Sequence, residues 1–219
     1  MHEVSLAGPV RNAMTTRTPR FVALLLALAL GGLACSSSPP PTAVGLGYVD
    51  PSGSGWRFVK DEENSTPDRL ILQLMGPQGV KSRGVAFNLV APAGLAFAAF
   101  ADGLPIEDTG VYELLSRDLD PNEPVAKAGG VKPGNMLTAG IFQKDRTWRA
   151  KDSGVALCRI ALVVDPASPT PSGRKLKLQV KRAAIMPEEI GAVTDDAWTL
   201  DSKLKLTDVT VDVGAVTTR

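Results

Sequence analysis

The stretch that decides the fold is Lys175-Leu-Lys-Leu-Gln-Val-Lys181, in which polar and apolar side chains alternate at every residue. Leu176, Leu178 and Val180 would face one way, and the lysines and the glutamine would face the other. A period of two residues is that of a β-strand, and the polar partners indicate a sheet with one face on a core and one in water. Segments 203–207 and 208–213 repeat the pattern. The C-terminal third therefore predicts antiparallel sheet.

Upstream of this stretch, short strand signals recur between turn residues, which include many of the 21 glycines and 17 prolines. The expected strands are 56–60, 70–75, 84–91, 95–101, 135–142 (with Gly140 as a candidate bulge) and 155–164. Segment 95–101 fits a strand better than a short helix because Gly94 and Gly103 bound it. Residues 118–134 are expected to be a loop, residues 186–191 a loop or one helical turn, and residues 111–115 a weak strand or a helical turn. The pattern predicts an all-β chain, a single antiparallel β-sandwich of about nine or ten strands, with a jelly-roll among the possible topologies.

The N-terminal region has the three-part layout of a secretory signal peptide. Arg17 and Arg20 precede an apolar run over 21–33, and Ala34 and Cys35 follow it. The run is too short for a membrane-spanning helix, which needs about 20 apolar residues. Met14 is a more natural start than Met1. We therefore expect residues 1–34 to be removed on export.

Gly32-Leu33-Ala34-Cys35 resembles the lipobox of bacterial lipoproteins, although Leu33 is one place late and glycine stands where leucine is usual. The resemblance implies a diacylglycerol on the sulfur of Cys35, usually with an N-acyl chain, and so a membrane anchor. Ser36, rather than Asp, after the cysteine implies the outer membrane where the cell has one. The alternative is an ordinary cleavage near Ala34 that leaves a free thiol.

The expected domain plan has three parts. The signal peptide covers 1–34, the lipidated cysteine and a Ser/Pro tether cover 35–46, and the β-sandwich covers 47–219. Serine keeps such a tether flexible, and the prolines of 36–42 favour an extended polyproline conformation.

Charge and histidine content exclude several functions. The chain has 24 Lys and Arg against 23 Asp and Glu. The leader contains Arg11, Arg17, Arg20 and Glu3, so the mature chain has 21 against 22, a net charge of −1. Nucleic acid is not an expected partner, because its binding needs a basic excess. The only histidine, His2, lies in the leader, so a mature chain would lack Ser-His-Asp and Cys-His catalysis and every His-ligated zinc site.

The cysteine count bears on stability. If Cys35 carries lipid, Cys158 has no partner and no intramolecular disulfide forms. Cys158 lies in the apolar run 155–164, so a small buried hydrophobic residue is expected there rather than a nucleophile.

Three groups of residues are candidate sites. Trp148 lies between Arg146 and Arg149 and would stack on a sugar or anchor a partner if exposed, whereas the alternative is a tryptophan folded over the core edge. Trp56 and Trp198 are expected at the core edge. Asp118, Asp120, Asn122 and Glu123 offer oxygen ligands for Ca²⁺, but the loop lacks the EF-hand spacing, and a solvated turn is the expected structure. We therefore expect no metal and no cofactor. Paired carboxylates for hydrolysis could come from Glu113, Glu123, Glu188 and Glu189.

The second half also resembles cohesin-type β-sandwiches and related carbohydrate-binding modules. The resemblance covers roughly 80–216 and rests on the strand ending Thr138-Ala-Gly-Ile-Phe142, the run 154–164, the alternating strand 176–181, the segment 183–191 and the valine-rich end 209–216. It implies adhesion or scaffold assembly through a sheet face or the loop ends. No binding residue is carried over, because no family motif matches position by position.

These observations favour a lipid-anchored, non-catalytic domain for protein binding or envelope assembly, whose partners are the membrane and another envelope protein or a polysaccharide. Two alternatives stay open. A carbohydrate-binding module would use an exposed aromatic such as Trp148. A carboxylate-based hydrolase would need two acidic side chains facing each other in a cleft.

Overall fold

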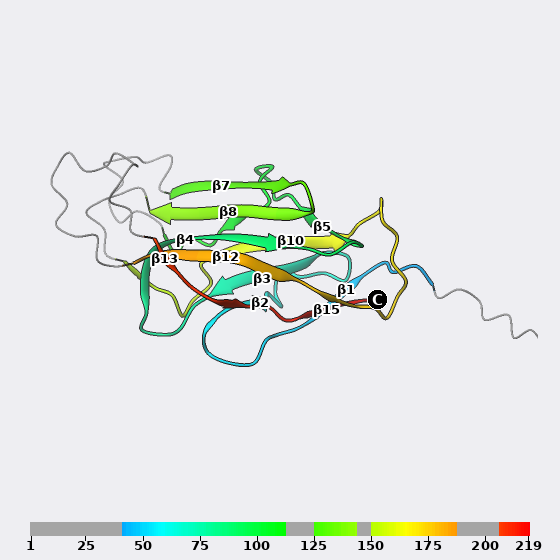
Figure 1. The fold of residues 1–219 in the computed structure, drawn as a ribbon, viewed down its shortest axis with the longest axis horizontal. Coiled ribbons are helices and arrows are strands. Elements are labelled where there is room, and N and C mark those ends of the chain that lie inside the picture. The colour runs from blue at the N-terminus through cyan, green and yellow to red at the C-terminus, as the bar shows by residue number, and fades with distance from the viewer. Residues whose placement is uncertain (1–40, 113–124, 144–149, 188–205) are drawn as a thin grey trace, which may run out of the picture. The chain divides into compact units, whose positions relative to one another are not determined.

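The computed structural model describes residues 41–112, 125–143, 150–187 and 206–219. All of them belong to the compact unit Pro39–Arg219. Within these ranges the chain forms fifteen strands and no helix, so no described helix is long and apolar enough to cross a membrane. Figure 1 shows the strands stacked in layers, which confirms the predicted all-β sandwich.

Three sheets make up the domain. The back sheet has the order β14–β2–β3–β10–β5, with β6 also paired to β10. The front sheet has the order β13–β12–β4–β8–β7, with β9 paired to β4. The small sheet has the order β1–β15–β11. Every pair is antiparallel except β14 and β2, which run parallel.

The strands have the following bounds. The back sheet contains β2 (Trp56–Lys60), β3 (Leu70–Met75), β5 (Leu95–Ala98), β6 (Glu107–Asp108), β10 (Cys158–Val164) and β14 (Val211–Asp212). The front sheet contains β4 (Lys81–Val90), β7 (Val125–Lys132), β8 (Met136–Gln143), β9 (Lys151–Asp152), β12 (Gln179–Pro187) and β13 (Thr207–Asp208). The small sheet contains β1 (Leu46–Val49), β11 (Lys175–Lys177) and β15 (Ala215–Thr218).

The alternating stretch that predicted the fold forms two strands rather than one. β11 pairs with β15 in the small sheet, and β12 pairs with β4 in the front sheet. Leu178 lies between them and is fully buried. Lys175, Lys177, Gln179 and Lys181 are exposed, as the pattern predicts. This stretch therefore joins two sheets through one buried leucine.

The core fills the space between the front and back sheets. Alternate residues of both sheets point into it, which is why the strand signals have a period of two. Phe58 of β2 and Phe87 of β4 meet across the layers, with ring centroids 5.2 Å apart and planes at 79°. An edge-to-face pair of this kind stabilises the contact between the sheets beyond the burial of its area. Trp56 is 8% exposed and belongs to the same core, as expected.

Three expectations about single segments were wrong. Residues 125–132, predicted as part of a loop, form β7, an edge strand that pairs with β8 along its whole length. Gly140 is not a bulge, because it keeps a regular register with Ala86 on one side and Ala128 on the other. β12 runs on to Pro187, into the segment expected to be a loop or helical turn. The sequence of β7 hides the strand, because alanine and glycine are depleted in strands and its two lysines are typical of an exposed edge.

The chain joins the domain a few residues before β1. Thr42 forms a β-bridge with Pro171, and the Ala43 N–H donates to the Thr170 carbonyl at 2.8 Å. The Val44 N–H donates to the Arg219 carbonyl at 2.8 Å. Residues 42–46, assigned to the tether in the domain plan, therefore already make contacts with the folded unit.

Candidate functional site

The middle of the outer face of the front sheet carries a row of small side chains in register. Successive residues of a strand point to opposite faces, and Val85, Phe87 and Leu89 of β4 point into the core. Their neighbours Ala86 and Asn88 therefore lie on the outer face, and the pairing of the strands extends each of them into a row. The first row is Asp208, Ala184, Ala86, Gly140 and Ala128, and the second is Arg182, Asn88, Thr138 and Gly130. We call these two rows the front face.

Four adjacent strands carry nothing larger than a methyl group along the first row, and this is unusual for a sheet that faces solvent. Alanine and glycine are depleted in strands, where β-branched and aromatic side chains fit better. The outward positions of an antiparallel sheet are usually polar. Small side chains let another molecule approach the sheet closely, except at Gly140, where the Phe142 ring lies over the strand. The composition of the front face therefore points to a contact surface rather than to a solvated one.

A shallow hollow lies on the front face at its β12 side. It has a volume of about 200 Å³ and is lined by Ala86, Phe87, Asn88, Thr138, Ala139, Arg182, Ala184 and Leu206. Ala184 is 4% exposed, whereas Leu206 is 45% exposed and is one of the few large apolar side chains in the described residues with that much exposure. An apolar floor next to an exposed leucine suits an apolar side chain of a partner.

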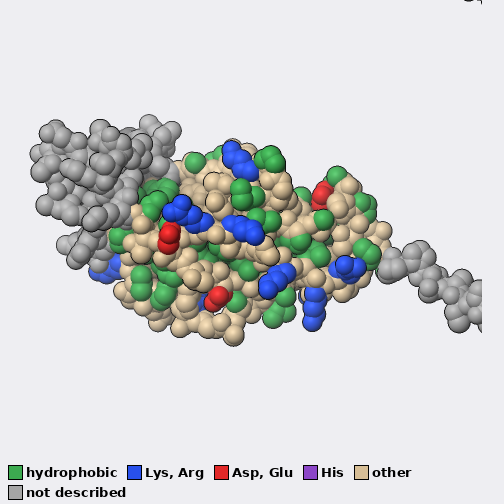
Figure 2. Space-filling view, in the orientation of Figure 1, with side chains coloured by type: hydrophobic (Ala, Val, Ile, Leu, Met, Phe, Trp, Pro, Cys, Tyr) green, Lys and Arg blue, Asp and Glu red, His purple; other side chains and the backbone are tan. Residues whose placement is uncertain are grey.

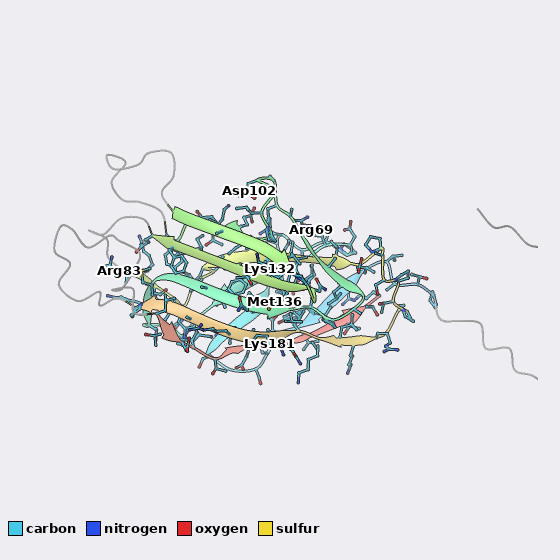
Figure 3. All side chains as sticks on the ribbon, turned by 45° about the horizontal axis from the view of Figure 1, so that its top comes forward. Arg69, Arg83, Asp102, Lys132, Met136 and Lys181 are labelled. Atoms are coloured by element: carbon cyan, nitrogen blue, oxygen red, sulfur yellow. The ribbon has the colours of Figure 1, made fainter. Side chains whose placement is uncertain are left out.

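The charges around the front face are mostly basic. Arg182 pairs with Asp208, with Nε and Oδ1 3.3 Å apart, and both side chains are more than two-thirds exposed. Lys181 on β12 and Lys132 at the end of β7 are exposed and have no ion pair within the described residues. Figure 2 shows Lys and Arg side chains spread among apolar ones with few acidic groups, and Figure 3 marks Lys132, Met136 and Lys181 on this sheet. An exposed pair such as Arg182–Asp208 adds little stability, at about 0–1 kcal/mol.

Three hydroxyl side chains form a cluster away from the front face. Serine and tyrosine occur in catalytic sites, but this cluster is closed to a substrate. Ser82 Oγ lies 2.7 Å from the Tyr112 hydroxyl and 3.0 Å from Ser153 Oγ. All three residues are fully buried. Burial raises the pKa of Tyr112, and the hydrogen bond with Ser82 offsets only part of that rise, so the phenol cannot act as a base near neutral pH. The cluster is a structural hydrogen-bond network.

Arg159 binds two carboxylates of the back sheet and its loops, those of Asp61 and Glu107. Arg159 Nε donates to Asp61 Oδ2 at 2.7 Å, and Arg159 Nη1 lies 3.4 Å from Glu107 Oε2. Asn64 also donates to Asp61 from its backbone and its side chain. Burial raises the pKa of Asp61, but the hydrogen bonds from Asn64 and Arg159 hold it below its ordinary value. This arrangement ties the loop after β2 to the back sheet, and the shared guanidinium gives it a structural role.

Cys158 has the buried position that the sequence predicts. Its side chain is fully buried in β10, and burial raises the pKa of its thiol well above the ordinary value. A protonated, inaccessible thiol is not a nucleophile.

Several predicted site residues lie outside the described residues. They are Cys35, the group of Arg146, Trp148 and Arg149, the calcium candidates Asp118, Asp120, Asn122 and Glu123, the acidic candidates Glu113, Glu188 and Glu189, and Trp198. No group of three His, Cys, Asp or Glu residues that could hold a metal occurs in the part of the chain that the structure describes. The front face was missed from the sequence because its β7 strand was taken for a loop. The alternation of Val85, Phe87 and Leu89 with smaller residues carried a usable signal for β4.

Comparisons with known proteins give structural similarity alone. No protein-family model matches the chain, and no curated protein matches it. In structure the chain is similar to cohesin domains. A type II cohesin domain from the cellulosome of Acetivibrio cellulolyticus shares 10% identity over 76% of this chain and 95% of its own, with a TM-score of 0.47.

Two further cohesins show similarly low sequence identity and TM-scores. The cohesin module of a family 33 glycoside hydrolase from Clostridium perfringens shares 14% identity over 78% of this chain and 99% of its own, with a TM-score of 0.35. A non-cellulosomal cohesin from the archaeon Archaeoglobus fulgidus shares 14% identity over 77% of this chain and 86% of its own, with a TM-score of 0.36. With TM-scores below 0.5, these similarities say nothing about a partner or an activity of this chain.

Proposed function

We propose that the chain is a non-catalytic protein-binding domain, anchored to the cell envelope through a lipid on Cys35, and that its partner docks on the front face. The row of Ala184, Ala86, Gly140 and Ala128 carries the docking half of the proposal. A partner strand or helix can approach β12, β4 and β7 closely along this row, and at Gly140 of β8 it would meet the Phe142 ring. The exposed Leu206 and the hollow beside it supply an apolar anchor point.

Two features of the described residues support a protein partner over a sugar. No aromatic side chain is classed as exposed in those ranges, so they offer no platform on which a sugar ring could stack. The front face is also broad and shallow, and such surfaces suit macromolecules better than small ligands, which prefer concave sites.

Photo-crosslinking tests the docking surface. A benzoylphenylalanine placed at the exposed Thr138 is expected to cross-link a protein partner in the producing cell. The same group at Val155, which is 45% exposed and lies outside the front face, is the matched control and should give no such product. Cross-linking at Val155 alone, or retention of the chain on envelope polysaccharide without any cross-link, would contradict the proposal.

A matched pair of arginine substitutions gives the affinity test. With the cross-linked partner purified, Thr138→Arg should weaken binding by at least about tenfold, because a long charged side chain would then stand on the flat row. Val155→Arg adds the same charge away from the front face and should leave binding within about twofold. Equal effects of the two substitutions would place the docking site elsewhere.

Metabolic labelling tests the anchor. The proposal rests on the order of basic residues, apolar run, small residues and Cys35 in the sequence. An alkyne fatty acid fed to the cells should label the wild-type chain and not Cys35→Ala. An unlabelled wild-type chain would remove the anchor while leaving the docking surface untouched.

A further inference from the structure

The outer face of the small sheet is a second exposed surface, with a different composition from the front face. Leu46, Tyr48, Leu176 and Val216 point into the core, so their neighbours point outward. The register forms two outward rows, Val49–Ala215–Lys177 and Gly47–Thr217–Lys175. A side chain at Gly47 would collide with the Arg219 guanidinium, which lies over this position.

The charge of this outer face is basic. Arg174, Lys175, Lys177 and Arg219 are exposed, and none of them has an ion pair within the described residues. A hollow of about 310 Å³ lies beside Lys175 and Lys177. Its single acidic lining residue, Asp50, already accepts a hydrogen bond from the Lys60 backbone N–H at 2.8 Å. The mature chain has a net charge near zero, so this is a local concentration of positive charge.

Two exposed valines lie on the same part of the domain. Val44 is 80% exposed and Val49 is 66% exposed, the highest values among the large apolar side chains of the described residues. A single exposed apolar residue is ordinary on a protein surface. Here Val44 lies two residues before β1 and Val49 is its last residue, and the four basic residues lie on the same sheet or at its ends. Apolar side chains next to unpaired cations match the two layers of a membrane interface, acyl chains below and anionic headgroups above.

The same part of the domain receives the tether. Pro41 accepts a hydrogen bond from the Ser172 backbone N–H at 2.9 Å, and Val44 and Gly45 both donate to the Arg219 carbonyl. The segment 170–174 thus holds the incoming chain and leads directly into Lys175. Six peptide units separate Cys35 from Pro41 and can span at most about 20 Å. In a chain anchored at Cys35, Pro41 stays within that reach of the membrane, and the basic outer face begins close to Pro41, at Arg174.

We propose that the outer face of the small sheet rests on anionic lipid headgroups, with its lysines and arginines against the phosphates and Val44 and Val49 at the acyl boundary. The inference builds on the proposed lipid anchor. Acyl chains give membrane attachment that a second signal strengthens. Each basic residue near an anionic surface strengthens binding about fivefold. The contact would also fix the orientation of the domain on the membrane.

Vesicle partitioning of the mature chain, starting at residue 35 and carrying Cys35→Ala, tests the surface without the covalent anchor. The chain is expected to sediment with vesicles of phosphatidylcholine containing about one-third phosphatidylglycerol, and not with phosphatidylcholine alone. Salt at about 0.5 M should release it, because the interaction is electrostatic. Lys177→Glu should weaken partitioning about 25-fold, because it removes one positive charge and adds one negative charge.

Lys132→Glu is the matched control, since Lys132 is also exposed without an ion pair but lies at the end of β7 on the front sheet. It should change partitioning by less than about twofold. Thermal unfolding of both variants checks that they fold. Absence of binding to anionic vesicles, equal binding to both kinds of vesicle, or equal losses in the two variants would each overturn the proposal.

Vesicle binding and the tests of the proposed function can fail independently of each other. Failure of fatty-acid labelling removes the anchor but leaves vesicle binding measurable, whereas failure of vesicle binding leaves the label and the Thr138 cross-link unaffected. If Lys177→Glu instead abolishes the complex with the cross-linked protein and vesicles do not bind, the basic surface belongs to that protein partner and the lipid proposal is wrong.

Discussion

Single hydrogen-bonding side chains connect strands that are far apart in the sequence. The Tyr48 hydroxyl donates to the Phe58 carbonyl at 3.0 Å and accepts from the Gly214 N–H at 2.6 Å. It therefore links β1, β2 and the turn between β14 and β15, where the back sheet meets the small sheet. Burial raises the pKa of Tyr48 to about 12, with a smaller opposing effect of the Gly214 bond.

Tyr48→Phe should destabilise the domain by about 1–3 kcal/mol, because the Gly214 N–H loses its acceptor in a partly buried place. Urea unfolding at neutral pH measures this. Between pH 10 and 12 the unfolded tyrosine releases its proton while the folded one keeps it, so wild-type stability should fall as the pH rises. The Tyr48→Phe variant should lack this contribution to the fall of stability with pH. Equal slopes in both proteins would contradict the assignment.

Asp61→Asn should destabilise the domain at pH 7 by about 1–3 kcal/mol, because the charged acceptor of Arg159 is lost. The folded pKa of Asp61 lies below the unfolded value. Its contribution is therefore present above the unfolded pKa and disappears as the pH falls through the folded one. The difference in unfolding free energy between wild type and Asp61→Asn should therefore shrink below about pH 4. Acid unfolding monitored by tryptophan fluorescence measures this difference. A difference that stays constant from pH 7 to pH 2 would contradict the role assigned to the Asp61 carboxylate.

Strands β8 and β7 each contain a glycine on the front face, and only the one in β8 lacks room for a side chain. A Cβ at Gly140 in β8 would lie 2.8 Å from the Phe142 ring and 3.3 Å from the Val85 carbonyl oxygen. A Cβ at Gly130 in β7 would meet nothing within 4 Å. Both residues lie on the front face, in neighbouring strands and adjacent rows, so they form a matched pair.

Gly140→Ala should cost about 1–3 kcal/mol, because the Phe142 ring has to move. Gly130→Ala should be neutral or slightly stabilising, by up to about 1 kcal/mol, because it restricts only the unfolded chain. Chemical denaturation of the two variants in parallel measures the difference. A loss at Gly130 as large as at Gly140 would show that β7 is more closely packed than its open edge suggests.

At the scale of the whole molecule, the sheets are joined through few residues, and Leu178 is one of them. It is fully buried between β11 and β12 and so packs where the small and front sheets meet. Leu178→Ala should cost about 2–5 kcal/mol, as large-to-small changes in cores do. Leu206→Ala, at a residue 45% exposed, is the control and should stay within about 0.5 kcal/mol. Calorimetry measures both, and similar melting temperatures would contradict a central role for Leu178.

Much of this architecture is predictable from local pattern. β2 and β3 have the predicted bounds, Trp56–Lys60 and Leu70–Met75, because apolar residues concentrated between turn residues define a strand. β7 is not predictable in this way, since Gly129 and Gly130 break its pattern and only the pairing with β8 reveals the strand. The same holds for the change of sheet at Leu178, because alternation continues through it unchanged.

The front face and the basic outer face depend on register, which a single sequence does not specify. Ala86, Gly140 and Ala128 come from three strands, and only the pairing places them in one row. Likewise, Val49 and Lys177 lie more than a hundred residues apart and meet through β15. A sequence pattern gives the face of a strand on which each side chain lies, whereas the neighbours across strands follow from the fold.

The way the tether enters the domain has a mechanical consequence. Thr42, Ala43, Val44 and Leu46 each bond to a different place, at Pro171, Thr170, Arg219 and Pro67, before β1 pairs with β15. If the proposed lipid on Cys35 holds the chain to a membrane, tension on the chain would enter the domain at Pro41. Within six residues it would be divided among three separate segments. A pull on the N-terminal segment would therefore load several parts of the fold at once rather than peel off a single strand.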